Sequence, residues 1–319
     1  MKIQNVLVIG GSGFLGRHVV RRLAEQGIDV TVPSRRRERA RDLILLPTVD
    51  VVTADVHDAA VLTSLMHDQD AVINLVGILQ GGRGTPYGNG FAQAHVELPR
   101  KIVAVAKQRG IKRLLHMSAL KAAVDAPSGY LRSKAAGEAV ILAAAPEIAV
   151  TVFRPSVIFG AGDEFLTLFA DLQKIFPLVP LGCPDAQFQP VWVEDVAASI
   201  VGSLENTASV GKTYSLCGPK TYRLRELVAL AGRYSGHRRP IIGLPDALAR
   251  LQALAAEFVP GIPLSRDSHD SMQISNTCDA GCTLPFGSVA TPLESIAPTY
   301  LAQNSKLASN DEFRRRAGR

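Results

Sequence analysis

One junction near the start of the chain constrains its fold most: a short apolar strand runs into a glycine-rich turn and then a helical pattern. The pattern predicts a strand at 4–9 and a helix at about 14–26. Between them the sequence reads Gly10-Gly11-Ser12-Gly13-Phe14-Leu15-Gly16. In such a junction Gly10 allows the tight turn, Gly13 lets the backbone approach phosphates, and Gly16 lets the helix pack closely. Free N–H groups at the helix start attract an anion, so the junction predicts a dinucleotide pyrophosphate site rather than a plain glycine turn.

Length and composition indicate a globular protein of one large domain or two joined domains. The chain has 319 residues, of which 47% are hydrophobic and 20% charged. Its four cysteines are too few for a disulfide scaffold and suggest a reducing compartment. Cys278 and Cys282 are close in sequence, but no second Cys or His pair completes a metal site, so no metal is predicted.

Charge and hydropathy bear on location and partners. The sequence from Met1 leads directly into the first strand without a signal peptide, and no apolar stretch reaches the ~18–20 residues of a membrane span. We therefore expect a cytoplasmic protein. The net charge is +6, with basic clusters at 35–41, 238–239 and 314–316. This balance permits an anionic ligand or the inner face of an anionic membrane as partner, but no nucleic-acid motif accompanies it.

The first half of the chain alternates strand and helix patterns. Strands are predicted at 4–9, 28–33, 49–53, 70–75, 111–117 and 148–153, and helices at about 14–26, 36–45, 58–67, 90–109 and 130–145. Such alternation predicts an α/β fold with a doubly wound parallel sheet. Ligands of these sheets bind at the carboxyl ends of the strands.

After residue 155 the pattern loosens and predicts a smaller, discontinuous C-terminal α/β domain. A strand is expected at 189–193, followed by a helix at 196–204 with Asp195 as its N-cap. Further helices are expected near 224–235 and 244–258. The predicted limits are 1–155, with 186–215 returning to it, for the nucleotide-binding domain, then 156–185 and 216–305 for the smaller domain, and a mobile basic tail at 306–319.

The end of the second strand bears on the choice of cofactor. NAD-preferring folds carry an acidic residue there for the ribose 2′-hydroxyl, whereas this chain has Ser34 and Arg35. Both can bind a 2′-phosphate through hydrogen bonds, which predicts NADP(H) in preference to NAD(H). The alternative is that the arginine run is only the solvated start of a helix. Asp55 ends the third strand, where it either reads the adenine amino group or caps a loop.

A Tyr-x-x-x-Lys pair follows the fifth predicted strand. Tyr130 and Lys134 are four residues apart at the start of a helix and so share one face. A nearby ammonium favours the phenolate of a tyrosine, which can then exchange the proton that accompanies hydride transfer at a carbonyl. The pair, after a dinucleotide turn, predicts a catalytic site in which Lys134 also holds the nicotinamide ribose.

With these motifs the chain resembles an extended or atypical short-chain dehydrogenase/reductase of the epimerase/dehydratase type. The stretches 130–138 and 153–165 are most similar to bacterial relatives of the accessory Rossmann-fold subunit of mitochondrial complex I. The resemblance implies a Rossmann fold, a nicotinamide cofactor and an oxidoreductase acting on a carbonyl or alcohol that the sequence does not identify. It also implies that cofactor contacts come from the ends of later strands, namely Val56, Leu75, Val76, Gly77, Met117, Pro155 and Val157.

Two departures from the family pattern concern the catalytic residues. The catalytic hydroxyl is expected at Ser118, but the family register points to Ala119, and His95 stands where relatives often have Asn. A missing hydroxyl donor costs on the order of a hundredfold in rate, so Tyr130 and Lys134 can serve mainly to bind the cofactor. Predicted substrate-lining residues, each of which can instead be core, are Gln80, Phe91, Phe159, Phe165, Phe169 and Trp192.

Two alternatives to the oxidoreductase stay open. The first is an NADPH-binding structural or assembly protein linked to a respiratory complex or quinone metabolism, as the resemblance to the complex I subunit implies. In that case the apolar stripe of helix 244–258, which is otherwise core, is an interfacial face. The second is a nucleotide-sugar epimerase or dehydratase, which the short distance between Ser118 and Tyr130 disfavours.

Overall fold

A seven-stranded parallel sheet forms the centre of the first of two structural units. The computed structural model describes residues 2–258, 264–279 and 283–302. The strand order is β11-β6-β5-β4-β1-β2-β3, and every neighbouring pair is parallel. The strands are β1 (Asn5–Ile9), β2 (Asp29–Ser34), β3 (Val49–Thr53), β4 (Ala71–Asn74), β5 (Arg113–Met117), β6 (Ala149–Pro155) and β11 (Thr213–Leu216). The predicted doubly wound α/β fold is confirmed.

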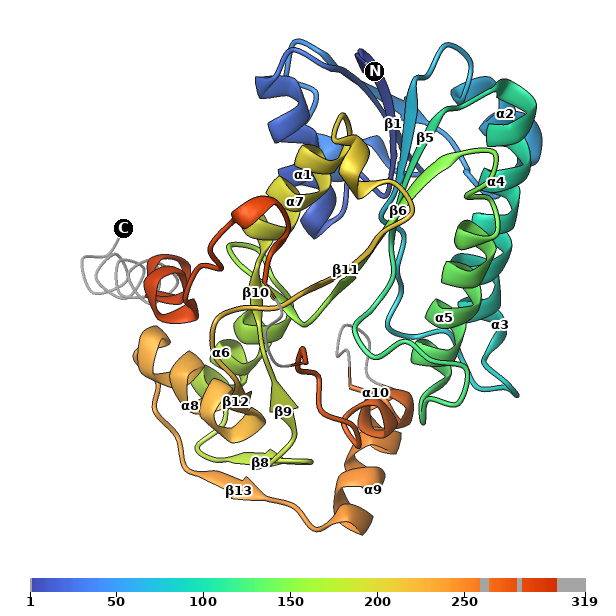
Figure 1. Cartoon of the computed structure of the whole chain (residues 1–319). Coiled ribbons are helices and arrows are strands. Elements are labelled where there is room, and N and C mark those ends of the chain that lie inside the picture. The colour runs from blue at the N-terminus through green and yellow to red at the C-terminus, as the bar shows by residue number, and fades with distance from the viewer. Residues whose placement is uncertain (1, 259–263, 280–282, 303–319) are drawn as a thin grey trace. The chain divides into compact units, whose positions relative to one another are not determined.

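Helices cover both faces of this sheet (Figure 1). One face carries α1 (Phe14–Glu25) and α7 (Val193–Ser203). The other carries α2 (Ala59–Leu65), α5 (Gly129–Leu142), and a long helix made of α3 (Asn89–Phe91), a π-helical turn (Ala92–Glu97) and α4 (Leu98–Arg109). Buried aliphatic residues such as Leu62, Ile102 and Ile141 fill the space between these helices and the strands.

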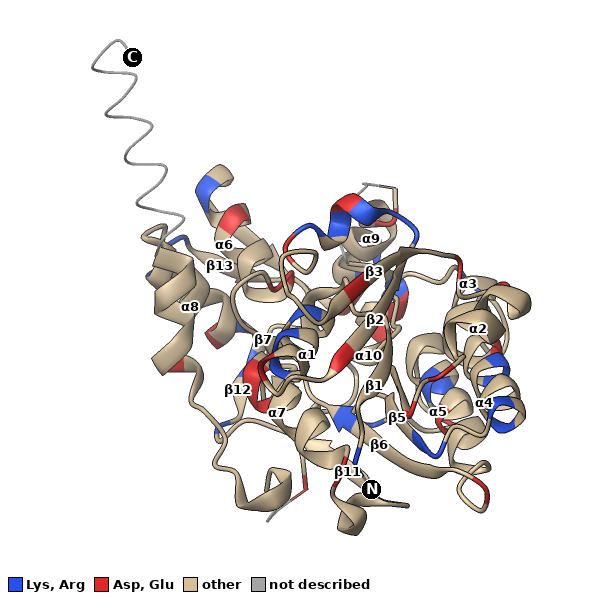
Figure 2. Cartoon of the chain, turned by 90° about the horizontal axis from the view of Figure 1, so that it is seen from above, with Lys and Arg blue, Asp and Glu red and all other residues tan. Residues whose placement is uncertain are grey.

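The contact between α1 and α7 is electrostatic as well as apolar. Figure 2 shows the acidic first turn of α7 beside basic residues of α1. Glu194 accepts hydrogen bonds from Arg22 Nε at 2.6 Å and pairs with His18 Nδ1 at 2.5 Å. The prediction that Asp195 caps a helix starting at 196 is wrong, because α7 already begins at Val193 and follows β10 (Val191–Trp192) directly.

The predicted helix at 36–45 is also wrong. Only a short 3-10 turn forms, at Arg37–Ala40. The apolar residues that suggested a helix are consecutive rather than spaced by three or four, so they cannot share one face. Leu43 is fully buried, whereas its neighbours Ile44 and Leu45 are exposed.

Among the described residues, the second unit comprises 156–192, 217–258, 264–279 and 289–302, while 193–216 and 283–288 belong to the first unit. Its helices are α6 (Phe165–Ile175), α8 (Leu224–Ser235), α9 (Asp246–Ala256) and α10 (Arg266–Ser271). The described residues 293–302 are helical as well. Three small sheets pair β7 (Ile158–Phe159) with β10, β9 (Gln187–Phe188) with β12 (Tyr222–Arg223), and β8 (Val179–Leu181) with β13 (Ile241–Gly243). Short 3-10 turns lie at Thr207–Ser209 and Pro285–Gly287. The domain limits expected from the sequence remain a prediction.

Helix α9 turns alanines, and not its leucine stripe, toward the core. The side chains that it buries are alanines, at 249, 253 and 256, whereas Leu248, Leu251 and Phe258 are exposed. In the described part of the chain, no helix is both long and apolar enough to cross a membrane. The predicted mobile tail at 306–319 lies outside the described residues.

One pair of cysteines forms a bond that the sequence did not predict. Cys217 and Cys278 form a disulfide with their Cα atoms 6.1 Å apart. These residues are separated by 61 positions, and only the fold brings them together, so their spacing could not reveal the pair. Among the described residues Cys183 is the free cysteine, and Cys282 lies outside them. No group of metal-ligating side chains occurs in the described part of the chain.

Candidate functional site

The glycine turn connects β1 to α1 at the carboxyl end of the sheet. Gly10 has φ +88°, a conformation open to glycine but costly for other residues. The N–H of Gly13 donates to the carbonyl of Gly10 at 3.0 Å and closes the turn. A Cβ atom on Gly16 would lie 2.2 Å from the Gly10 oxygen. The first turn of α1 therefore lies against the glycine turn only because residue 16 has no side chain.

The start of α1 fits an anionic group. Gly13 is its exposed N-cap, no side chain caps the helix, and its first turn holds no acidic residue. Leu15 is buried, and the ring of Phe14 packs edge-on against His18. Free N–H groups and a helix dipole at such an end attract phosphate. The residues at this turn therefore fit a dinucleotide.

The loops after the neighbouring strands converge on the same turn. A Cβ on Gly10 would be 3.1 Å from the carbonyl carbon of Leu75 and 3.2 Å from the nitrogen of Val76. The N–H of Leu75 donates to Ile9 at the end of β1. The structure thus brings Leu75 and Val76 beside Gly10, as expected for loops at the carboxyl edge of a parallel sheet.

The first residue after β2, Arg35, is an exposed cation. Ser34 is 7% exposed, and its hydroxyl donates to the carbonyl of Arg36 at 2.9 Å. Arg35 is exposed and has no hydrogen bond or ion pair with the described residues. At the end of β3, Asp55 is exposed and accepts the N–H of His57 at 3.0 Å, which forms a local turn, while Val56 packs against the core.

Lys134 is a buried cation at the carboxyl end of the sheet. It is 3% exposed, and its Nζ donates to the carbonyls of Val76 and Met117 at 3.2 and 3.1 Å. A Cβ on Gly77 would be 3.3 Å from Nζ. Burial lowers the pKa of Lys134 to about 8, so it remains mostly charged at neutral pH. An ammonium has three donors, and two of these have partners among the described residues.

Tyr130 lies one turn before Lys134 on α5 and is partly exposed. Its ring meets His95 edge-on, with the ring centres 5.6 Å apart, and Phe91 at 6.1 Å. Phe91 is 1% exposed, so it is a core residue rather than a lining residue. The aromatic contacts fix the plane of the tyrosine ring.

His95 supports the backbone around this site as a neutral side chain. Its Nε2 accepts the N–H of Ile78 at 3.1 Å, and its Nδ1 lies 2.8 Å from the hydroxyl of Ser133. That hydroxyl donates to the carbonyl of Tyr130, so the network assigns the proton of His95 to Nδ1. Burial, with the charge of Lys134 adding to it, lowers the pKa of His95 to about 2. His95 therefore links the loop after β4 to helix α5 and keeps both ring nitrogens occupied.

His116 is a buried polar residue that sequence reasoning missed. Its Nδ1 lies 3.2 Å from the amide nitrogen of Asn74, whose oxygen accepts the N–H of Val76. Its Nε2 is buried and has no hydrogen-bond partner among the described residues. Burial, followed by the charge of Lys134, lowers the pKa of His116 to about 3. The one available signal was a histidine inside an otherwise apolar strand.

Ser118 places a hydroxyl at the carboxyl end of β5. The residue is 2% exposed, and its N–H donates to the carbonyl of Phe153 at 2.8 Å. Its Oγ has no hydrogen-bond partner among the described residues. Ala119 is buried as well. An unsatisfied buried hydroxyl is uncommon, and a bound ligand is one way in which such a group becomes satisfied.

The remaining predicted residues fall into different parts of the chain. Pro155 ends β6 in the first unit, and its carbonyl accepts the N–H of Leu120. Val157 belongs to the second unit and packs against that unit's core, as do the predicted lining residues Phe159, Phe165, Phe169 and Trp192. Gln80 is exposed. The structure therefore brings the glycine turn, Val76, Met117 and Lys134 together at the carboxyl edge of the sheet. Most of the aromatic residues that were predicted to line a substrate site lie in a core instead.

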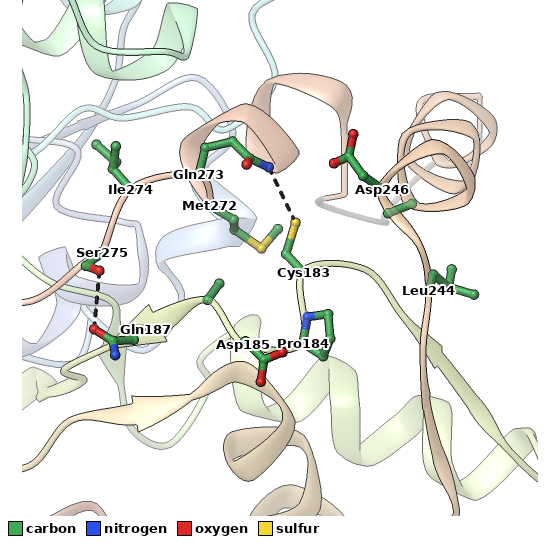
Figure 3. Close-up of a pocket in the computed structure, with 12 residues that line it drawn as sticks. Cys183, Pro184, Asp185, Gln187, Leu244, Asp246, Met272, Gln273, Ile274 and Ser275 are labelled. Atoms are coloured by element: carbon green, nitrogen blue, oxygen red, sulfur yellow. Dashed lines mark hydrogen bonds between the residues drawn. The ribbon is translucent and has the colours of Figure 1, made fainter.

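The second unit contains a cavity of about 530 Å³, drawn in Figure 3. The free thiol of Cys183 accepts from Gln273 at 3.8 Å, and the hydroxyl of Ser275 donates to Gln187 at 3.2 Å. Two carboxylates, of Asp185 and Asp246, also line it. Burial, with Asp246 adding to it, raises the pKa of Cys183, so this thiol is protonated and a poor nucleophile.

Comparison with known proteins agrees with the sheet and the glycine turn. The model of the NAD dependent epimerase/dehydratase family matches residues 6–217. The subunit named NADH dehydrogenase [ubiquinone] 1 alpha subcomplex subunit 9, mitochondrial, from Arabidopsis thaliana is 35% identical over 259 residues, 79% of this chain and 63% of that protein. A ceramide reductase from Caulobacter vibrioides is 31% identical over 245 residues, 76% of this chain and 74% of that protein. The chain spans about six tenths of the length of the curated relatives that it matches first.

Among solved structures, the UDP-glucuronic acid 4-epimerase from Bacillus cereus, in complex with UDP-glucuronic acid and NAD, superposes with a TM-score of 0.71. The alignment covers 94% of this chain and 99% of that one at 18% identity, so it shows the fold alone. The family match and the 31% identity with the Caulobacter vibrioides reductase show the family as well as the fold. This chain belongs to the NAD dependent epimerase/dehydratase family and is an atypical relative of the short-chain dehydrogenase/reductases.

Proposed function

We propose that this protein binds NADP(H) and is an oxidoreductase that acts on a carbonyl or alcohol substrate. The observation that carries the proposal is the buried Lys134, which donates to the carbonyls of Val76 and Met117 and retains donor capacity. A buried ammonium without a carboxylate partner is costly, and a ligand that accepts its hydrogen bond offsets part of that cost.

Each part of the first unit has a role in binding. The glycine turn and the start of α1 hold the pyrophosphate, and Leu75, Val76 and Gly77 form the floor beside them. Lys134 donates to the hydroxyls of the nicotinamide ribose. Arg35 holds the 2′-phosphate, because an exposed guanidinium without a partner can form charge-assisted hydrogen bonds to phosphate. Ser34 joins it only when its hydroxyl turns from the carbonyl of Arg36 to the phosphate. Asp55 lies at the adenine.

The reaction needs a proton at the substrate oxygen. A bound nicotinamide would supply or accept the hydride. The hydroxyl of Tyr130 gives or takes the proton, and the charge of Lys134 stabilises its phenolate. The unsatisfied hydroxyl of Ser118 donates a hydrogen bond to the substrate oxygen. His95 does not exchange protons, because both of its ring nitrogens are occupied.

Competitive titration of NADPH and NADH tests the cofactor preference. We expect tighter binding of NADPH, and we expect Arg35→Asp to weaken NADPH by about tenfold or more while leaving NADH nearly unchanged. Arg37→Asp, also exposed and on the same segment, is the charge-matched control. Tighter binding of NADH to the unaltered protein would contradict the NADP(H) preference.

Turnover of candidate substrates tests the reductase. The relative named ceramide reductase makes ceramide-related carbonyl compounds the first panel to use. We expect Tyr130→Phe to abolish oxidation of NADPH by an accepted ketone while its binding of NADPH persists. A Tyr130→Phe variant that turns over at the unaltered rate would reject the role of the hydroxyl.

The second candidate is a protein that holds NADPH without turnover, in the cytoplasm at the inner membrane face and associated with a respiratory complex or quinone metabolism. The closed hydrogen-bond network of His95 favours it, because both ring nitrogens are occupied and this side chain therefore does not relay protons to Tyr130. Relatives named as NADH dehydrogenase subunits support it as well. The purified protein would then carry NADPH that no carbonyl oxidises, and it would co-purify with a membrane complex.

A nucleotide-sugar epimerase or dehydratase is the third candidate, and the short distance between Ser118 and Tyr130 disfavours it. The cavity at Cys183 in the second unit gives it no support either, because the charged residues that line this cavity are Asp185 and Asp246. Such a lining repels a nucleoside diphosphate.

A further inference from the structure

A second cavity in the second unit, of about 720 Å³, lies over α8 and is rich in cations. Four of its lining residues are basic: Lys220, Arg233, Arg238 and Arg239. The two acidic lining residues, Glu226 and Glu294, already have partners. Glu226 accepts the N–H of Arg223 at 2.7 Å, which caps α8. Glu294 accepts from Lys220 at 3.1 Å and from the hydroxyl of Tyr222 at 2.8 Å.

The three arginines of the cavity, in contrast, retain N–H donors that have no acceptor among the described residues. Arg233 and Arg238 are exposed and have no hydrogen bond or ion pair with the described residues. Arg239 donates from Nε to the carbonyl of Gln173 at 3.0 Å, which anchors its guanidinium at the end of α6. The cavity therefore presents three guanidinium groups whose planar forks match the oxygens of a phosphate.

Groups that suit the rest of a ligand surround these arginines. Tyr234 and Leu230 line the same cavity. Gln173 is 1% exposed, and its amide nitrogen donates to the carbonyls of Phe169 and Val228. Its Oε1 is buried and has no hydrogen-bond partner among the described residues. Just beyond it, the end of α6 exposes apolar side chains, with Ile175 at 73% and Phe176 at 50%. Arginines that can bind phosphate thus lie near exposed apolar side chains at the end of α6.

We propose that this cavity binds a phosphate-bearing ligand, at a site separate from the dinucleotide turn. Arg233, Arg238 and Arg239 hold the phosphate, and Tyr234 packs against the group that carries it. The cavity differs from the one at Cys183, whose charged lining residues are carboxylates. The same chemistry can come from a soluble phosphate ester or from a phospholipid headgroup, whose acyl chains would meet Ile175 and Phe176.

Two probes test the proposal on the full chain. Inorganic phosphate is titrated calorimetrically, and vesicles of phosphatidylcholine, with and without phosphatidylglycerol, are sedimented with the protein. The test variant is Arg233→Gln/Arg238→Gln. The control, Arg223→Gln/Arg225→Gln, removes the same charge from exposed arginines at the start of α8 that pair with Asp185. All three proteins keep the dinucleotide turn, so binding there is common to them.

We expect the test variant to lose about tenfold or more in affinity, corresponding to one charge-assisted hydrogen bond, while the control keeps its affinity. Loss of phosphate binding without preference for anionic vesicles identifies a soluble ligand. Loss of anionic-vesicle binding that Ile175→Ser/Phe176→Ser reproduces identifies a lipid headgroup. Equal losses in test and control variants, or no binding of either probe by the unaltered protein, would overturn the proposal. Because all the altered residues are exposed, thermal unfolding should be unchanged.

Discussion

Two buried cations of the first unit, Arg113 and Lys134, show how the opposite ends of one strand differ. Arg113 begins β5, is 3% exposed, and donates to the carbonyls of Ala149, Ser203 and Leu204 and to two hydroxyls, at 2.7 to 3.2 Å. Lys134 donates to Met117 at the other end of β5 and to Val76. Neither has a carboxylate partner among the described residues.

The difference lies in what remains unsatisfied around each cation. The guanidinium of Arg113 donates to carbonyls and hydroxyls from three segments of the chain, so each of its three nitrogens has an acceptor. Around Lys134 the hydroxyl of Ser118 and the Nε2 of His116 have no described partner. At the amino end of β5 the protein itself therefore supplies the hydrogen-bond partners of the buried cation. At the carboxyl end, buried polar groups remain whose hydrogen bonds a ligand can complete.

Replacing Arg113 should have the largest effect. Arg113→Met leaves several buried carbonyls and hydroxyls without donors, and we expect the free energy of unfolding to fall by about 3–5 kcal/mol. Urea unfolding measures this loss. Arg113→Lys keeps the charge but not the fork, and should recover only part of it. A loss below about 1 kcal/mol for the methionine variant would show that the amino edge does not depend on this residue.

Acid should destabilise the Lys134 end of the sheet selectively. The pKa values of His95 and His116 are lowered from 6.5 to about 2 and about 3, so the unfolded chain binds protons that the folded chain refuses. Stability is therefore present above pH 6.5 and is lost as pH falls toward the folded values, by about 1.4 kcal/mol per pH unit for each histidine.

Urea unfolding at pH values from 7 down to about 5, above the range in which most carboxylates titrate, isolates these histidines. His95→Asn should reduce the slope by about half, whereas His67→Asn, at an exposed histidine, should not change it. An unaltered protein whose stability is flat over this interval would contradict the neutral, buried state of both rings.

Replacing Lys134 should affect binding more than folding. Lys134→Met removes a desolvated charge along with two hydrogen bonds, so we expect a smaller loss of stability than for Arg113→Met. The dissociation constant for NADPH should rise by about tenfold, measured by fluorescence titration. In the unaltered protein, binding should weaken as pH rises through about 8, where Lys134 loses its charge, and this dependence should disappear in the variant. Unchanged affinity in Lys134→Met would place this lysine with Arg113 as a structural cation.

The same contrast explains how much the sequence could predict. The glycine turn and strand alternation are local patterns, and they were enough to predict the parallel sheet and the position of α1. Helix 224–235 was also predicted with its observed bounds because its apolar residues recur at helical spacing. Local spacing failed at 36–45, where consecutive apolar residues pack in a turn, and at α9, where alanines rather than leucines face the core.

Non-local contacts were beyond sequence reasoning. Arg113 takes its acceptors from residues 36 to 96 positions away, and Asn74 lies 42 positions from His116. The pair Tyr130 and Lys134 could be found because both lie on one helix turn. The cofactor and catalytic roles of the glycine turn, Lys134 and Ser118 stay predictions, because they depend on a ligand as well as on the fold.

The Cys217–Cys278 bond gives the second unit a covalent topology that its backbone alone lacks. It closes a ring that contains β12, α8, β13, α9 and α10. A protease that cuts the backbone once inside this ring, for example on the exposed side of α9, would leave both fragments attached to one another. The nicked protein would migrate as a single chain on a denaturing gel until a thiol reductant is added, so a gel pair run with and without reductant reports the state of this bond directly.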